Sequence, residues 1–349
     1  MKKYVAFALL ASIIAAGAFL LLKEIGKNEA QLHVYTWADY VKPELIQRFE
    51  QEHNCRVVID TFDSNETMYS KLKAGASGYD VITPSSYMVK LMNEQGMIIP
   101  LDHEQLPNLK HVDPDFLKLS FDPAMHHSVP YAFSITGIAY LKSKVPDFRP
   151  SWTMFDRTDL KGRMTMLNDM RETIGAALKI GGKSLNTTDQ ASLSAAGAIV
   201  INWKKNLAKF ENEQYKVGLA SGEFVLVQGY SGDILQIQEE NPDVAFAIPE
   251  EGASVCFDDM VIPVTAKQRA LAHAYINFMH DPGVAAQNTE FTMYLCPNKS
   301  AYPLLNEEIR NNPSIFLKPE VLDRCEIIGD LGSENARYTA VWDRIKAAE

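Results

Sequence analysis

Cysteine is scarce in this chain, and the few cysteines are far apart. Cys55, Cys256, Cys296 and Cys325 are the only four among 349 residues, and no two of them have the short spacing of a zinc site. We therefore expect neither a metal nor a cofactor. The sequence does not show whether any of these cysteines pair in disulfides, and buried free thiols are the simplest expectation.

An excess of positive charge is also missing. The net charge is −10, which argues against nucleic acid as a partner because that interaction needs a basic face. An acidic surface is compatible with a cationic partner. No repeat, low-complexity tract or Gly/Ser-rich linker interrupts the chain, and its 349 residues suffice for two globular lobes.

Complete catalytic motifs are absent as well. The segment "GGKS" (181–184) resembles a phosphate loop, but Ala177 stands where that loop requires a glycine. The segment "GYSGD" (229–233) nearly matches a nucleophile elbow, but Asp233 replaces its final glycine. The sequence therefore predicts a protein that is not an enzyme.

The N-terminus has the pattern of an export signal. Two lysines, Lys2 and Lys3, precede the uncharged run 4–22, which contains the small residues Ala16-Gly17-Ala18. This pattern predicts that residues 1–30 form a signal peptide, cleaved after Ala18, or an uncleaved membrane anchor. In either case we expect the remainder to act in the periplasm.

The rest of the chain alternates strand-like and helical segments. Strands are expected over 32–37, 55–62 and 79–84, with helices over 43–54 and 64–75 between them. Such units predict a parallel sheet covered on both sides. A second series follows the strand-like run 129–141 and includes a long helix around 191–210, strands over 224–230 and 259–264, and a last helix over 336–348. We predict two α/β lobes joined by strands, with a cleft between them.

Aromatic and acidic residues recur where strands end. Any one instance is explained by a packed ring and a helix cap. The pattern repeats, however, at Trp37, Asp39 and Tyr40, Ser85 and Tyr87, Asp169 and Glu172, Tyr230 and Asp233, Asp258, and Tyr294. Several rings and several carboxylates around one cleft suit a flexible cation, because rings hold its methylenes and carboxylates bind its ammonium groups.

The same segments resemble the periplasmic spermidine/putrescine-binding proteins of bacterial ABC transporters. The resemblance runs from residue 32 to the C-terminus, is densest over 63–98, and continues through "VPYAFSITGIAY", "DMRE", "NTTD", "YSGD", "DDMVIP" and "YLCPN". It implies the type II periplasmic-binding-protein fold, an α/β fold with two lobes joined by crossing strands. The first lobe would contain 31–134 and 258–302, and the second 135–257 and 303–349.

The resemblance also implies a ligand site made of the eleven residues named above. Three positions depart from the family pattern. Tyr230 stands where the family usually has Trp, Cys256 replaces an aromatic residue, and Ala38 replaces a hydroxyl residue. These changes leave the preference between putrescine and spermidine open, although Asp39 and Asp233 resemble the putrescine-preferring branch.

The resulting hypothesis is a monomeric receptor that binds polyamine and delivers it to an ABC transporter permease. The alternatives are a surface-anchored polyamine sensor and a receptor of the same fold for another small cationic solute. A carboxylate ligand would need an arginine in the cleft, and Arg171 is the only candidate near the proposed site. A hydrolase using Asp169 and Glu172 is disfavoured, because two carboxylates three residues apart on one helix lie on the same side of a substrate.

Overall fold

The computed structural model describes residues 30–118 and 120–348. Its N-terminal part alternates strands and helices as predicted. The elements in this part are β1 (Ala30–Thr36), α2 (Pro43–His53), β2 (Cys55–Thr61), α3 (Asn65–Lys73), β3 (Val81–Ile82), α4 (Ser86–Glu94), α5 (Pro114–Leu117) and β4 (Ser128–Leu141). Ser64 caps α3, where its side chain accepts a hydrogen bond from the Thr67 backbone N–H.

A second α/β series follows β4. It contains β5 (Met164–Met166), α6 (Met170–Ile180), α7 (Gln190–Lys204), β6 (Leu207–Phe210), α8 (Gln214–Ser221), β7 (Leu226–Tyr230), α9 (Ser231–Glu240), β8 (Val244–Ala247) and β9 (Ser254–Val261). The C-terminal part adds α10 (Arg269–Met279), α11 (Pro282–Thr292), α12 (Glu307–Arg310), α13 (Pro319–Leu322), β10 (Glu326–Ile327) and α14 (Asn335–Ala347).

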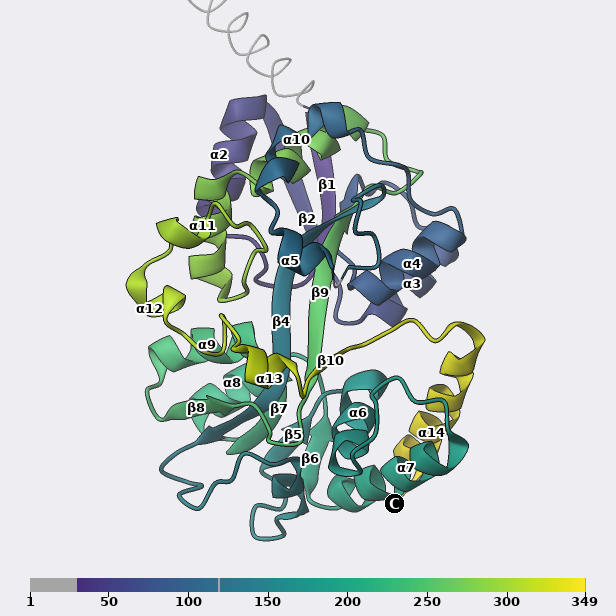
Figure 1. The fold of residues 1–349 in the computed structure, drawn as a ribbon, viewed down its shortest axis with the longest axis vertical. Coiled ribbons are helices and arrows are strands. Elements are labelled where there is room, and N and C mark those ends of the chain that lie inside the picture. Colours follow the sequence, from purple (N-terminus) through teal and green to yellow (C-terminus); the bar gives the residue numbers. More distant parts are fainter. Residues whose placement is uncertain (1–29, 119, 349) are drawn as a thin grey trace, which may run out of the picture.

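Two strands, β4 and β9, run side by side through the middle of the molecule and join its two halves (Figure 1). They pair antiparallel with each other, within a sheet of order β2-β1-β3-β9-β4-β7-β5-β6. We call the half with β1–β3, α2–α4, α10 and α11 the first lobe, and the half with β5–β8, α6–α9 and α14 the second lobe. The residue limits predicted for the lobes stay a prediction.

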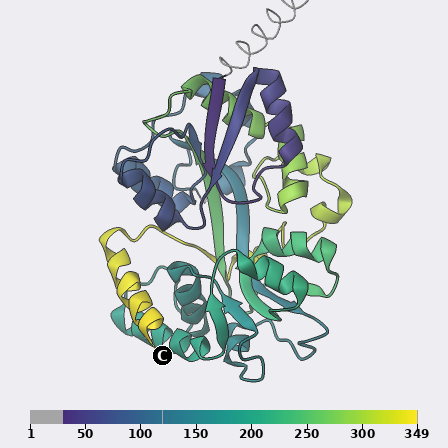
Figure 2. The same cartoon turned by 180° about the vertical axis from the view of Figure 1, so that it is seen from behind.

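Each lobe has its own hydrophobic core. Phe49 and Tyr275 are buried in the first lobe, and Trp152, Trp203 and Tyr215 in the second. Seen from behind, the C-terminal helix α14 lies against α6 and α7 of the second lobe (Figure 2). This organisation leaves the carboxyl ends of the strands of both lobes facing each other across the middle of the molecule.

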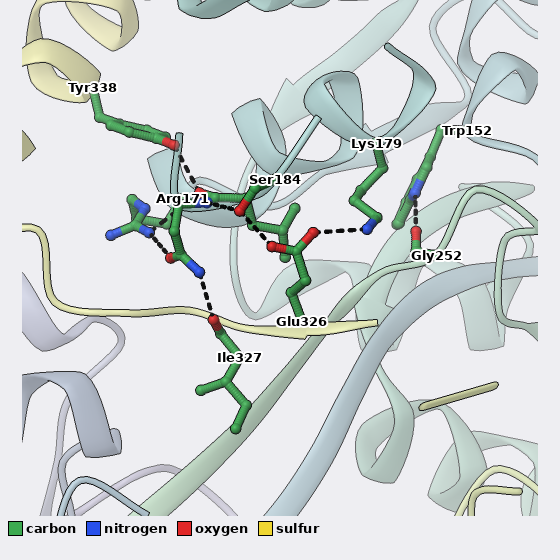
Figure 3. Close-up of polar contacts among 10 residues, drawn as sticks. Trp152, Arg171, Lys179, Ser184, Gly252, Glu326, Ile327 and Tyr338 are labelled. Carbon is green, nitrogen blue, oxygen red and sulfur yellow. Dashed lines mark hydrogen bonds and ion pairs between the residues drawn. The ribbon is translucent and has the colours of Figure 1, made fainter. Parts of the chain in front are cut away.

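The C-terminal segment is fastened to the second lobe by polar contacts (Figure 3). β10 pairs parallel with the start of β9. The Glu326 carboxylate lies 2.9 Å from Lys179 Nζ and accepts a hydrogen bond of 2.5 Å from Ser184 Oγ. Asn186 Nδ2 donates to the Ile327 carbonyl at 2.9 Å. These contacts hold the next residue, Ile328, where it lines the cleft.

Three details of the predicted fold were wrong. The helix expected around 191–210 ends at Lys204, and Leu207–Phe210 form strand β6, which pairs with β5. β9 starts at Ser254 rather than near 259, so Asp258 lies inside a strand and not before one. The sheet is mixed and not purely parallel, because β9 pairs antiparallel with both β3 and β4.

The predicted signal or anchor lies almost wholly outside the described residues. Within residues 30–118 and 120–348, no helix is long and apolar enough to cross a membrane. The same residues contain no cluster of three or more His, Cys, Asp or Glu side chains arranged to hold a metal ion. Cys256, Cys296 and Cys325 are free thiols.

Candidate functional site

A cavity of about 790 Å³, counting its open mouth, lies between the two lobes. Ten of the eleven predicted site residues line it. From the first lobe and the connecting strands come Trp37, Tyr40, Ser85, Tyr87, Asp258 and Tyr294, and from the second lobe come Asp169, Glu172, Tyr230 and Asp233. Because these side chains come from both lobes, a ligand held here would tie the lobes together.

Asp258, in the middle of β9, is the most organised carboxylate of the site. Tyr40 donates its hydroxyl to one Asp258 oxygen, and Ser85 Oγ donates to the other at 2.7 Å. Asn65 fixes Ser85 by donating to its hydroxyl and accepting from its backbone N–H, both at 3.0 Å. Burial raises the pKa of Asp258 to about 6. No protein cation within the described residues pairs with this carboxylate.

A second acidic position lies at the N-terminus of α6. Asp169 caps the helix, because its carboxylate accepts from the backbone N–H groups of Arg171 at 2.8 Å and Glu172 at 3.1 Å. The Glu172 carboxylate accepts from the Ser254 hydroxyl, whose oxygen also lies 3.0 Å from the Thr136 hydroxyl. Burial, together with the nearby Asp169 carboxylate, raises the pKa of Glu172 to about 7. Asp169 therefore both caps a helix and lines the cavity.

Asp233, in the first turn of α9, is held by two tyrosines. Tyr215 donates to one carboxylate oxygen at 2.5 Å, and Tyr294 donates to the other at 2.8 Å. Tyr294 can come this close because Gly232 has no side chain. A Cβ on Gly232 would lie 2.6 Å from the Tyr294 ring. The "YSGD" segment thus supplies both the Asp233 carboxylate and the glycine that allows the Tyr294 ring to pack close to it.

Aromatic rings supply much of the remaining wall. The Tyr40 ring lies edge-on to the Tyr294 ring, with centroids 5.3 Å apart, and the Trp37 ring packs on Phe62 at 4.4 Å. Tyr87 also lines the cavity, and its hydroxyl donates to Glu66 at 3.4 Å. Flat apolar faces next to carboxylates are the environment that an alkyl chain with charged amino ends requires.

Asp39 is the one predicted residue that does not line the cavity. Its backbone has φ 53° and its side chain is 68% exposed. The carboxylate lies 3.5 Å from Nζ of Lys216, a residue of α8 in the second lobe. Asp39 therefore pairs with a cation of the protein itself in this structure, and its predicted contact with a ligand ammonium stays a prediction.

Arg171 is part of the cavity wall, and the two terminal nitrogens of its guanidinium already donate hydrogen bonds within the protein (Figure 3). It donates to the Gly329 carbonyl at 2.9 Å, the Asn186 side chain at 2.8 Å and the Leu185 carbonyl at 3.3 Å. Its Cζ also lies 4.7 Å from the centre of the Tyr338 ring. Only 3% of the residue is exposed, and of its guanidinium nitrogens Nε alone has no hydrogen-bond partner, so most of this arginine is engaged within the protein.

Sequence reasoning missed several lining residues. The largest omissions are Asn65, which orients Ser85, and Lys216, a cation in a cleft where carboxylates outnumber cations. Asn65 lies inside the segment with the strongest family resemblance, so the resemblance could have found it. Lys216 lies on the short helix α8, whose sequence gave no signal. The other missed members of the wall are Asp63, Ser64, Ser134, Asn212, Glu213 and Ile328.

Two α/β lobes joined by crossing strands, with a polar cleft between them, define the class of periplasmic binding proteins with the type II fold. The comparisons with known proteins agree with this class. The family model for bacterial extracellular solute-binding proteins matches residues 44–316, and the chain belongs to this family. The resemblance to spermidine/putrescine-binding proteins and the predicted fold class are thereby confirmed.

Individual relatives cover nearly the whole chain. A spermidine/putrescine-binding periplasmic protein of Escherichia coli is 32% identical, over 96% of this chain and 97% of its own. A putrescine-binding periplasmic protein of Pseudomonas aeruginosa is also 32% identical, over 97% of this chain and 98% of its own. The solved spermidine/putrescine ABC transporter substrate-binding protein of Streptococcus pneumoniae superposes with a TM-score of 0.78 at 31% identity, over 91% of this chain and 99% of its own.

Proposed function

We propose that this protein is a non-catalytic receptor that binds polyamines in the interlobe cleft and delivers them to an ABC transporter permease. The observation that carries the proposal is the Asp258 carboxylate. It is buried and organised by Tyr40 and Ser85, and no protein cation within the described residues neutralises it. A buried carboxylate with a raised pKa becomes a stable anion when an ammonium group binds it.

The charge balance of the wall supports a cation over an anion. Six carboxylates line the cavity and only two cationic side chains do, Arg171 and Lys216. Arg171 is taken up by carbonyl groups and Asn186, and Lys216 lies against Glu213 and Asp39. Both cations are thus largely engaged within the protein, and the six carboxylates outnumber them. The names of the relatives, which specify putrescine and spermidine, support the same ligand class.

The proposed roles follow from position. Asp258 would bind one ammonium, and Asp169 with Glu172 would bind the other. The rings of Trp37, Tyr40, Tyr87, Tyr230 and Tyr294 would enclose the methylenes between them. Lobes that close around the ligand would present one composite surface to permease subunits in the inner membrane, and a monomer suffices for this task.

Calorimetry of the chain from about residue 30 tests the proposal. Putrescine, cadaverine, spermidine and spermine would be titrated, with 4-aminobutyrate as a matched control that replaces one ammonium by a carboxylate. We expect putrescine to bind with a Kd in the micromolar range or below, and 4-aminobutyrate to bind at least a hundredfold more weakly, about 2.7 kcal/mol. Absence of binding by all four amines would refute the ligand class.

The proposal includes a location outside the inner membrane, motivated by the lysines and apolar run at the N-terminus. N-terminal sequencing of protein recovered from the periplasm or the membrane should begin near Phe19 or show an intact anchor. Recovery from the cytosol with Met1 retained would contradict this part of the proposal.

A further inference from the structure

Asp258 is followed in β9 by a second aspartate, which the proposed ligand site does not use. Successive side chains of a strand point to opposite faces, so Asp258 lines the cavity while Asp259 lies in the interior, with none of it exposed. Its Oδ2 atom accepts hydrogen bonds from Ser86 Oγ at 2.8 Å and from Ser128 Oγ at 3.5 Å. Its Oδ1 atom is buried and has no hydrogen-bond partner within the described residues.

No positive charge of the described residues compensates this carboxyl group. None of the ion pairs among residues 30–118 and 120–348 includes Asp259. The charged groups that act on it are Asp258 on the same strand and Asp122 before β4, and both are acids. Because an unpaired carboxylate is very costly to bury, the neutral acid is the favoured form in the folded protein. Burial, with a smaller contribution from the two acids, raises the pKa of Asp259 to about 7.

Both aspartates are joined to the turn between β3 and α4. Ser85 Oγ donates to Asp258 at 2.7 Å, and the next residue, Ser86, donates to Asp259. The Asp259 backbone N–H also donates to the Pro84 carbonyl at 2.9 Å. Two consecutive serines thus bind two consecutive aspartates, one pair on the cavity side of β9 and the other on the interior side. The interior pair therefore fixes the turn from which Ser85 reaches Asp258.

We propose that Asp259 is a positioning residue, which as a neutral acid binds Ser86 and thereby holds Ser85 where it donates to Asp258. The inference rests on the proposed polyamine function. A neutral Asp259 leaves Asp258 as the only anion of the two neighbours, so a single ligand ammonium compensates their charge. Asp259 does not touch the ligand and was not among the residues predicted for the site.

The same substitution at the two neighbouring aspartates tests this inference by calorimetry with putrescine. Asp258→Asn should lose about tenfold or more in affinity, whereas Asp259→Asn, which has the shape of the neutral acid, should bind within about threefold of the parent. Ser86→Ala removes the contact with Asp259 and should weaken putrescine about three- to tenfold.

Ser128→Ala is the matched control for Ser86→Ala. Ser128 is a buried serine that contacts the same carboxyl group, but it belongs to β4 and not to the turn that carries Ser85. This variant should bind putrescine within about threefold of the parent. In a Ser85→Ala background, Ser86→Ala should cost less than about twofold, because the contact that it supports is already absent.

The pH dependence of stability tests the protonation state of Asp259 without any ligand. The folded protein keeps this proton up to about pH 7 and the unfolded chain loses it at about pH 4, so the group makes the free energy of unfolding fall as the pH rises between these values. Asp259→Asn lacks this contribution. Its melting temperature relative to the parent should therefore rise by about 2–4 °C between pH 5 and pH 8. Asp147→Asn, which removes an exposed carboxylate, should keep a constant difference.

Three results would overturn the inference. One is an Asp259→Asn protein that loses as much putrescine affinity as Asp258→Asn, which would show that Asp259 acts as an anion. Another is parent-like binding by folded Ser86→Ala, or additive losses from Ser85→Ala and Ser86→Ala, with folding judged from melting curves. The third is a melting difference between Asp259→Asn and the parent that does not change with pH. If the parent binds no polyamine, the proposed function fails, while the melting curves still test the state of Asp259, so the two failures are distinguishable.

Discussion

Asp258 and Asp233 are the same residue type in similar hydrogen-bond settings, yet their surroundings differ in charge. Each carboxylate accepts two side-chain hydroxyls, from Tyr40 and Ser85 in one case and from Tyr215 and Tyr294 in the other. Lys216, which lines the cavity, directly follows the Tyr215 that binds Asp233, whereas no cation within the described residues pairs with Asp258. The comparison shows that a count of acidic residues does not define ammonium positions. Asp258, which has no protein cation beside it, is the first candidate for an ammonium position.

The largest effect is expected at Asp258. Replacing it by Asn keeps the shape but removes the charge-assisted contact, which should cost about 1.5–3 kcal/mol, or roughly ten- to a hundredfold in putrescine affinity. Calorimetry measures the loss, and Asp147→Asn is a matched control, since Asp147 belongs to an exposed ion pair with Arg157. An Asp258→Asn protein that binds putrescine like the parent would make Asp258 a structural residue.

The pH dependence of binding should be nearly as large. Ligand ammonium groups bind the anionic carboxylates, so a proton on Glu172, whose pKa is raised to about 7, has to leave before binding. One such group lowers the apparent affinity about tenfold between pH 8 and pH 6. Asp258, with its pKa raised to about 6, adds to the loss below pH 6. An affinity that is constant or rises as the pH falls would contradict these protonation states.

A smaller effect is expected at the aromatic wall. Trp37→Leu removes a ring face while keeping apolar bulk, which should weaken putrescine about three- to tenfold if the ring contributes a cation–π contact. Phe62→Leu is the control, because Phe62 packs on Trp37 but does not line the cavity. Equal losses in the two variants would show that Trp37 acts by packing alone.

The smallest effect is expected at Asp39. Its carboxylate is exposed and lies against Lys216, so Asp39→Asn should change putrescine affinity less than about threefold. Isothermal titration at low and at physiological salt measures the change. A loss comparable to that of Asp258→Asn would restore Asp39 as a direct ligand of an ammonium group and would remove the distinction between the two ends of the cleft.

Much of this arrangement could be predicted from sequence, for a physical reason. Periodicity identifies strands and helices, and loops converge at the carboxyl ends of strands, so the pattern of residues alone selects Trp37 and Asp169 as members of the cleft. The errors have physical causes too. The 191–210 segment contains no sequence signal that separates the end of a helix from the start of a strand. Only pairing with β5 makes Leu207–Phe210 a strand.

Charge compensation between distant segments was not predictable. Lys216 and Asp39 lie in different lobes, and nothing in either local pattern indicates that they meet across the cleft. Likewise, Asp258 was expected beside a strand, but it lies within β9, where pairing with β4 and contact with Ser85 bury it. Long-range contacts of this kind depend on how the two lobes face each other.

The most direct test of the central claim compares Asp258→Asn with Asp233→Asn in calorimetric titrations with putrescine under identical conditions. If the ligand uses the position that lacks a protein cation, the Asp258 variant should lose about tenfold or more in affinity, and the Asp233 variant less than about threefold. Equal losses, or a larger loss in the Asp233 variant, would contradict the account, because they would show that the ligand does not depend mainly on the carboxylate that lacks a protein cation.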